Sequence, residues 1–444
     1  MIRELPAVCR RCVGLVVAAA ALGLAVSSQA QAATVTDTFK ATHGAQSWTV
    51  PPGVTSVTFD VYGAAGEPAE GQEVGTSPTP GGTGAHVQAT LAVTPGQVFE
   101  IVVGDHDGFN GGGTPGLALQ PVNQGGGGGG ASDVRAGACA TSLTCDLSSR
   151  ILVGGGGGGG GGLGISVESG SSNSVDGGAG GNAGATGRAG TGERGAGGGG
   201  GGGAGGSATG GSAGTGGTAT GGDRNTPGIP GVAGMLGQGG AGGGNRRAGT
   251  AGGGGGGGGY YGGGGGGEGG ATVRDVDADE GGGGGGGGGS SFVGPGAVGG
   301  MVAGNTGPNG DGLVQITYAA QDVQIAIAGR NGLLGRGVIS VAVLSTSDFD
   351  ARTIDPDTVC FGDAEDPTQR DCTEVPGRTA VLDMNHDRVP DLLLQFNTEE
   401  SGIDPGDSQA CLTGRTLDGT PIAGCATIVG IPTLLPLLGF PVFP

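Results

Sequence analysis

Apolar and polar residues alternate with a period of two in short segments near the N-terminal end of the chain. The segment 57–61 alternates Val, Phe and Val with Thr and Asp, and the segment 87–93 repeats the pattern. Successive side chains of a strand point to opposite faces of a sheet, so this pattern predicts strands with one buried face. Proline and glycine turns at 51–53 and 95–96 separate them. We therefore expect an antiparallel β-unit over 34–105.

Two more strands, at 151–153 and 313–318, lie on the far sides of long glycine tracts. The pattern therefore predicts one interrupted domain over 33–320, with strands in 34–105, 131–165 and 305–320. Uninterrupted glycine fills the segments 125–130, 154–162, 197–203, 253–259, 262–267 and 281–289. These tracts fall within 110–300.

The tracts have two competing interpretations. Glycine loses the most backbone entropy on ordering, and glycine-rich linkers behave as flexible coils, so composition alone favours disorder. The alternative is polyglycine II, a helix with three residues per turn whose backbone groups point outward and can bond laterally to neighbouring helices. Tracts of this length would each span on the order of 20 to 30 Å.

Several ordered peptides accompany the tracts: Gln-Ser-Trp-Thr-Val-Pro at 46–51, then 54–62, 93–96, Gly-Ala-Ser-Asp-Val-Arg at 130–135, 151–154 and Gly-Tyr-Tyr-Gly at 259–262. This series resembles bacterial secreted glycine-rich proteins, which are similar to the glycine-rich extracellular domain of anaplastic-lymphoma-kinase-type receptors. The resemblance covers about 34–320. It implies an all-β fold, a jelly-roll, tumour-necrosis-factor-like sandwich carrying an inserted bundle of polyglycine II helices. Receptor signalling is not implied, because no kinase or transmembrane segment follows.

The first 32 residues are typical of a signal peptide: arginines precede an apolar run at 13–26, and Ala-Gln-Ala follows at 30–32. An uncleaved anchor is the alternative, but the run is short for a membrane span. Removal leaves three sequence-close cysteine pairs: 139 and 145, 360 and 372, and 411 and 425. In an exported chain these predict disulfides, with the connectivity left open. Zinc is disfavoured because the mature chain has no CxxC motif.

Charge excludes several classes of function. The formal net charge is −20 and Lys40 is the only lysine, so the chain lacks the basic surface that nucleic acids or anionic membranes need. Cations are the more natural small partners. The four histidines share no sequence signature. The nucleophile-elbow match at 210–214 lacks the strand and helix that such a site requires, and we expect no enzyme.

Glycine falls to ordinary levels after residue 320, where a second β-rich domain over 321–430 is expected. Apolar strands are predicted at 338–344 and 392–396. Peptides at 341–344, 358–359, 390–392 and 410–414 resemble a β-rich module at the ends of many secreted bacterial proteins. The apolar tail 431–444 contains four prolines and is too short to span a bilayer, so we expect it to pack on this domain.

A candidate structural calcium loop lies at 383–391. Asp383, Asn385, Asp387 and Asp391 supply side-chain oxygens at positions one, three, five and nine, and Val389 offers a carbonyl at seven. The loop resembles those of integrin-type propeller repeats. A polar turn is the alternative, because an arginine at 388 takes the place where such loops prefer glycine. A second acidic cluster, at 275–280, is expected to be a solvated tip.

These observations predict a non-enzymatic protein that is secreted or held at the cell surface. The expected function is structural or adhesive, with loops displayed on a rigid polyglycine scaffold toward an extracellular protein, glycan or matrix surface. A ligand-type or receptor-type binding module is the alternative. Ice binding is a third class, disfavoured because we see no regular Gly-X-X repeats. No nucleic-acid partner and, after signal removal, no membrane span are expected.

Overall fold

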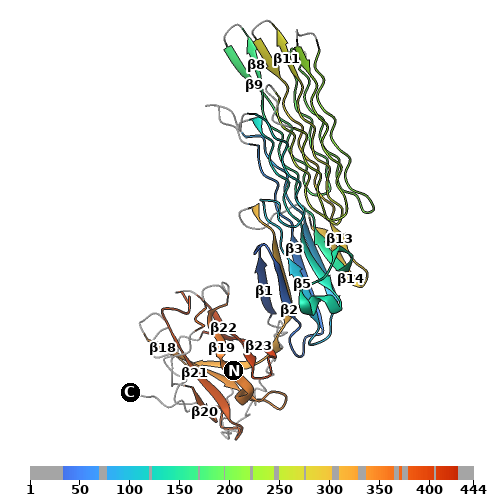
Figure 1. The fold of residues 1–444 in the computed structure, drawn as a ribbon. Coiled ribbons are helices and arrows are strands. Elements are labelled where there is room, and N and C mark those ends of the chain that lie inside the picture. The colour runs from blue at the N-terminus through green and yellow to red at the C-terminus, as the bar shows by residue number, and fades with distance from the viewer. Residues whose placement is uncertain are drawn as a thin grey trace, which may run out of the picture.

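The computed structural model describes residues 34–69, 78–119, 123–168, 171–194, 196–220, 224–244, 250–274, 277–302, 310–328, 337–364, 370–372, 379–404 and 407–428. The predicted signal peptide and the apolar tail lie outside these residues. The described chain is almost entirely β, as predicted, with short 3-10 turns between some strands. A glycine-rich bundle, a two-sheet sandwich and a C-terminal domain follow one another along an elongated molecule (Figure 1). Within the described residues, no helix is long and apolar enough to cross a membrane.

Two five-stranded sheets form the sandwich in the middle of the molecule. The first has the order β1 (Thr34–Lys40), β15 (Leu313–Ala319), β3 (Ser56–Tyr62), β4 (His86–Ala92), β14 (Ala297–Val302). The second has the order β13 (Phe292–Val293), β7 (Arg150–Gly154), β6 (Ser132–Ala136), β5 (Val98–Val102), β2 (Ala45–Thr49). Strand β15 pairs with both β1 and β3. The chain therefore returns to its first sheet after the whole glycine-rich region.

The core of the sandwich consists of the inward-facing residues of both sheets. Phe59 from β3 and Phe99 from β5 are fully buried and meet edge to face with ring centroids 5.5 Å apart. Trp48 packs beside them, and Val, Ile and Leu side chains complete the cluster. Burial of these side chains is the main apolar contribution to the stability of this half of the chain.

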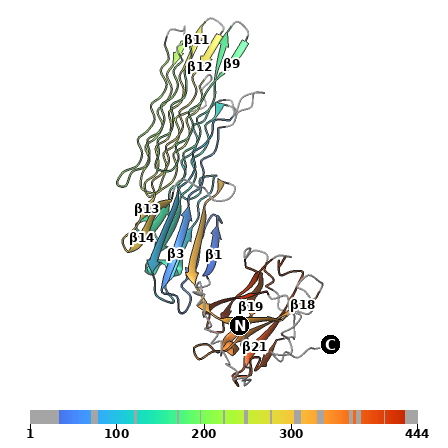
Figure 2. The same cartoon turned by 180° about the vertical axis from the view of Figure 1, so that it is seen from behind.

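The glycine tracts run side by side beyond one end of the sandwich (Figures 1 and 2). Along the tract 154–162, successive amides from 156 onward donate in rotation to three segments, at 252–258, 64–67 and 178–181. Its carbonyls accept from three others, at 82–85, 126–129 and 283–289. The tract thus has six hydrogen-bonded neighbours and a repeat of three residues. The tracts 252–258, 262–270 and 281–289 have the same two features.

Only glycine fits at the centre of this array. A Cβ atom on Gly283 would lie 2.0 Å from the carbonyl oxygen of Gly252, and one on Gly158 would lie 2.2 Å from that of Gly286. In the outer segments one residue in three faces the interior. In 227–236 a Cβ on Gly228, on the glycine at 231 or on that at 234 would lie 2.0 to 2.2 Å from a carbonyl oxygen of the tract 262–270, while the residues between them include proline, valine and methionine.

This arrangement corrects one observation from the sequence. Regular Gly-X-X repeats do occur, in the outer segments 209–219 and 227–236, because only one of every three residues there faces the interior. The pure glycine tracts need glycine at every position because neighbouring segments pack against them on all sides.

A small sheet caps the far end of the bundle. Its order is β10 (Arg224–Thr226), β11 (Ala271–Arg274), β12 (Asp277–Glu280), β8 (Gly164–Glu168), β9 (Ser171–Val175). These strands continue the glycine segments and join them in pairs.

The C-terminal domain contains two four-stranded sheets around a second core. One has the order β16 (Gln321–Asp322), β23 (Pro421–Thr427), β22 (Gln409–Thr416), β19 (Ile354–Asp363). The other has the order β17 (Gln324–Ala328), β18 (Val338–Leu344), β21 (Asp391–Asn397), β20 (Ala380–Leu382). Phe361 and Phe396 stack in the core. The predicted strands at 338–344 and 392–396 are β18 and most of β21.

One polar cluster joins the C-terminal domain to the sandwich. Trp48 and Tyr318 both donate to Oδ2 of Asp37, at 2.7 and 2.9 Å. Arg415 of the C-terminal domain donates to the Tyr318 hydroxyl at 3.3 Å. The turn at Gly419 also faces Pro52. The two domains are therefore joined by side-chain contacts as well as by the connecting chain.

The six cysteines among the described residues form disulfides, in the sequence-close pairs noted above: Cys139–Cys145, Cys360–Cys372 and Cys411–Cys425. The last pair links adjacent strands β22 and β23, where the two residues face each other. These bonds fit a chain that folds in an oxidising compartment.

Candidate functional site

A cavity of about 500 Å³ lies where the bundle meets the sandwich. Backbone of the glycine segments forms much of its wall, and its polar side chains are Glu67, His106 and Gln124. One carboxylate oxygen of Glu67 accepts a hydrogen bond from the amide of Gly127 at 2.8 Å. The cavity is of the size that small ligands occupy.

Carboxylates surround the histidine at this cavity. Nδ1 of His106 lies 2.6 Å from Oδ1 of Asp311, and its Nε2 lies 3.4 Å from Asp107. The hydrogen bond with Asp311 raises the pKa of His106 above its ordinary value, and the neighbouring negative charges act in the same direction against a partial burial. Several carboxylates facing one imidazole leave a net negative site, which favours a cationic group over an anion.

Sequence reasoning found none of the pairings that the histidines make with carboxylates. His43 pairs with Asp105 at 2.8 Å, and His86 pairs with Asp60 at 2.7 Å while stacking on Tyr62. Most partners are distant in the sequence, so only the fold brings them together. The Asp-His-Asp peptide at 105–107 was the one local signal. Each pairing supplies a carboxylate to orient the imidazole and no nucleophile.

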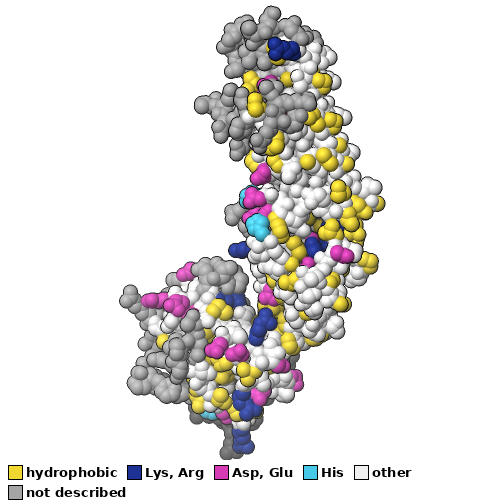
Figure 3. All heavy atoms as spheres, in the orientation of Figure 1, with side chains coloured by type: hydrophobic (Ala, Val, Ile, Leu, Met, Phe, Trp, Pro, Cys, Tyr) yellow, Lys and Arg dark blue, Asp and Glu magenta, His cyan; other side chains and the backbone are white. Residues whose placement is uncertain are grey.

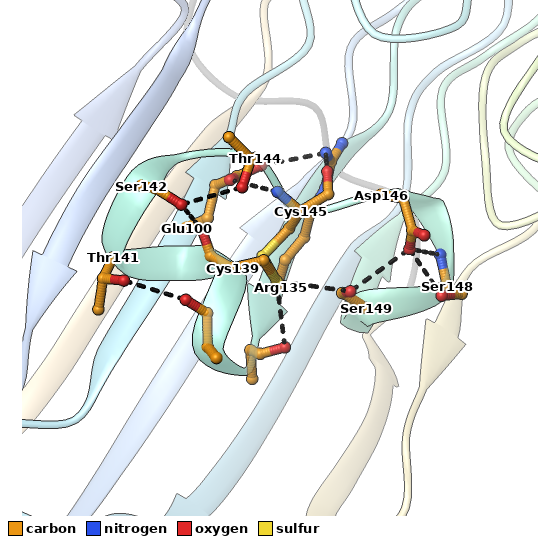
Figure 4. The surroundings of a disulfide bond; sticks show 12 residues. Glu100, Arg135, Cys139, Thr141, Ser142, Thr144, Cys145, Asp146, Ser148 and Ser149 are labelled. Carbon is orange, nitrogen blue, oxygen red and sulfur yellow. Dashed lines mark hydrogen bonds and ion pairs between the residues drawn. A yellow bond between two sulfur atoms is a disulfide. The ribbon is translucent and has the colours of Figure 1, made fainter.

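The sandwich also contains a buried ionic cluster beside the Cys139–Cys145 disulfide (Figure 4). Arg135 donates to Asp133 at 2.6 Å and to Glu100 at 3.1 Å, and both carboxylates are almost completely buried. The guanidinium and Glu100 also bond the carbonyl and the amide of Cys145, at 2.8 and 3.1 Å. Because every charge here has a partner, the cluster fixes the 138–149 loop to the sheet and has a structural role.

The far end of the bundle contains carboxylates that the sequence predicted to be solvated. That prediction is wrong for Asp279, which is fully buried 3.6 Å from Arg194, and for Glu280, which is largely buried and accepts from Asn123 at 2.7 Å. Burial raises the pKa of Glu280 to about 7. The bundle packs around this end, which is why the acidic residues lose solvent. Asp275 lies outside the described residues.

The predicted calcium loop folds as a turn before β21. Asp391 is fully buried, and its two oxygens accept from the amides of Ser345 and Met384 at 2.8 Å each. Asn385 accepts from the amide of Asp387, and Asp387 accepts from the amide of Val389.

One oxygen in this loop stands apart. Oδ2 of Asp383 accepts from the amide of Arg388, but its buried Oδ1 has no hydrogen-bond partner. Arg388 has φ 74°, the left-handed conformation in which calcium loops prefer glycine. Within the described residues, no group of three or more His, Cys, Asp or Glu side chains is arranged to hold a metal ion. Asp383 therefore has one buried carboxylate oxygen that accepts no hydrogen bond.

Charge is distributed unevenly over the bundle. The described residues of 196–220 and 225–244 include no charged side chain. On the face seen in Figure 3, charged groups gather at the tip, on the lower domains and near the junction of bundle and sandwich, here called the waist. Much of the length of the bundle shows none. Val232 and Met235 are more than half exposed along this uncharged side.

No model of a known protein family matches the chain, and no curated protein matches it in sequence.

Proposed function

We propose that the glycine tracts form a polyglycine II bundle inserted in a jelly-roll, tumour-necrosis-factor-like sandwich, as in the secreted glycine-rich proteins that the chain resembles. The repeat of three residues and the six lateral neighbours of each central tract support this assignment. The two facing antiparallel sheets, with β15 closing against β1, support the sandwich.

The function that this architecture supports best is that of an exported, non-enzymatic structural or adhesive protein of the cell surface. The observation that carries the proposal is the hydrogen bonding of successive amides of each central tract to different neighbours. Such a bundle resists bending because any bend separates several bonded segments at once. It acts as a rigid spacer that holds the capping sheet away from the C-terminal domain and presents both to extracellular partners.

Attachment assays on the producing cells test this function. Cells without the chain should adhere less to at least one extracellular protein, glycan or matrix surface, and added purified chain should bind that surface and restore adhesion. A variant with Gly286→Val, in which the bundle is disrupted, should restore less. Unchanged adhesion together with no binding of the purified chain to any of these surfaces would refute the proposal.

The cavity at the waist favours a ligand-binding module as the second candidate. Glu67 and the carboxylates around His106 suit a cationic group such as a primary amine or a guanidinium. Small amines and guanidines should then raise the melting temperature of the parent, and Glu67→Gln should reduce the shift. An equal shift in both proteins would remove the cavity from consideration.

The loop at 383–391 is proposed as a weak structural calcium site. The unpartnered Oδ1 of Asp383 favours it, and Asn385, Asp387, Asp391 and the carbonyl of Val389 would complete the oxygen ligands. Bound calcium would neutralise the repulsion among these carboxylates and fix the turn before β21.

A further inference from the structure

Among the described residues, strand β14 is an open edge of the sandwich. It pairs with β4 along its whole length and is the last strand of its sheet. Val298, Met301 and Val302 are 78, 60 and 44% exposed. Edge strands present a row of unpaired backbone groups, which natural proteins shield with charges, proline or bulges. The sequence of β14, Ala-Val-Gly-Gly-Met-Val, contains no charge and no proline, and its register with β4 is regular.

The opposite edge of the same sheet differs. Strand β1 carries Asp37 and Lys40. Its four exposed residues are all polar or charged: Thr34, Thr36, Thr38 and Lys40. One edge of the sheet is therefore shielded in the usual way, and the other is apolar and neutral. This contrast points to a partner for β14.

We propose that β14 pairs antiparallel with β14 of a second copy of this chain, around a two-fold axis at Gly300. When two identical edge strands pair antiparallel, the side chains of paired residues lie on the same face of the sheet. Paired residues are therefore an even number of positions apart in the sequence, and the residue midway between them lies on the two-fold axis. With Gly300 on the axis, Val298 faces the partner's Val302 and Gly299 faces the partner's Met301. Every side-chain pair is then apolar or involves glycine.

The neutrality of this strand lowers the electrostatic cost of pairing with a second copy. Two chains of net charge −20 repel each other, and the repulsion is least where the contacting strand is neutral. Gly300 also leaves room for the approach, because a Cβ placed on it would meet nothing within 4 Å. The pairing continues one sheet through both molecules and leaves the bundle, the capping sheet and the waist cavity free. It is independent of the function proposed above.

Sedimentation equilibrium of the mature full-length chain tests the proposal with charge variants. Gly300→Lys places two lysines opposite each other, and Gly300→Glu places two glutamates there. Each should raise the dimer dissociation constant at least tenfold, while an equimolar mixture of the two should restore dimers. Thr38→Lys, which adds the same charge to the exposed face of β1, is the matched control and should dimerise like the parent.

Cross-linking tests the register. Gly300→Cys should form a disulfide-linked dimer in the oxidised protein, whereas Gly44→Cys, another open glycine position of the sandwich, should not. A parent that stays monomeric at high micromolar concentration, equal cross-linking of the two cysteine variants, or mixed charge variants that stay monomeric would each overturn the proposal. Protection from hydrogen exchange of those β14 amides that point away from β4, in a monomeric parent, would assign the edge to another segment of the same chain and would also overturn it.

Discussion

Replacing Gly286 by alanine should destabilise the glycine-rich domain strongly, although alanine adds a single methyl group. The new Cβ would lie 2.0 Å from the carbonyl oxygen of Gly255 and 2.5 Å from its carbon. Ordinary contacts begin near 3.4 Å, so the two segments must separate by more than 1 Å. The hydrogen bonds from Gly254 to Gly284 and from Gly257 to Gly287, both 2.8 Å long, flank this point and would be lost.

The magnitude follows from those two bonds. A buried backbone group left without its partner costs about 1 to 3 kcal/mol, so the loss is about 2 to 6 kcal/mol. That is a large part of a typical stability of about 5 to 15 kcal/mol. The melting temperature should fall by about 5 to 20 °C.

The matched control is Gly206→Ala at the edge of the bundle. Its Cβ would meet only Thr209, at 3.4 and 3.7 Å, so the methyl group fits and the substitution restricts the unfolded chain. Its melting temperature should equal or exceed that of the parent, as measured by circular dichroism. Equal melting temperatures for Gly286→Ala and the control would refute the packing argument.

Three further predictions concern charged groups. The pKa of Glu280 is raised to about 7, so its protonated form favours the folded state: stability should fall as the pH rises from about 4.5 to about 7, and Glu280→Gln should remove that part of the pH dependence in thermal melts. Millimolar calcium should raise the melting temperature of the C-terminal domain, and Asp387→Ala should abolish the shift; equal melting in calcium and in chelator would reduce the loop to a polar turn. Asp37→Ala removes the acceptor shared by Trp48 and Tyr318 and should cost about 1 to 3 kcal/mol in chemical denaturation, whereas Thr38→Ala beside it should cost little.

The periodic strands were predictable from the sequence because a strand with one buried face alternates apolar and polar residues. Val57, Phe59 and Val61 are all fully or nearly fully buried in β3, and the strands at 151–153 and 313–318 are present as β7 and β15. The cysteine pairs were also predictable, since the paired residues are close in sequence.

The arrangement of the glycine tracts was not predictable in the same way. A run of glycine has no side-chain pattern that would identify the neighbouring segment, and its composition alone favours disorder over order. The waist cavity was equally hidden, because His106 and Asp311 are separated by 205 positions. The buried state of Asp279 depends on the packing of the bundle end, which charge alone does not reveal.

Hydrogen exchange of the glycine amides in 154–162 and 281–289 tests the central claim most directly. The amides of these tracts are bonded laterally to neighbouring segments and buried, so they should exchange only when the bundle opens. We predict rates at least a thousandfold, or about 4 kcal/mol, below those of an unfolded chain. Exchange at random-coil rates in the native protein would contradict the ordered bundle and the rigid spacer built on it.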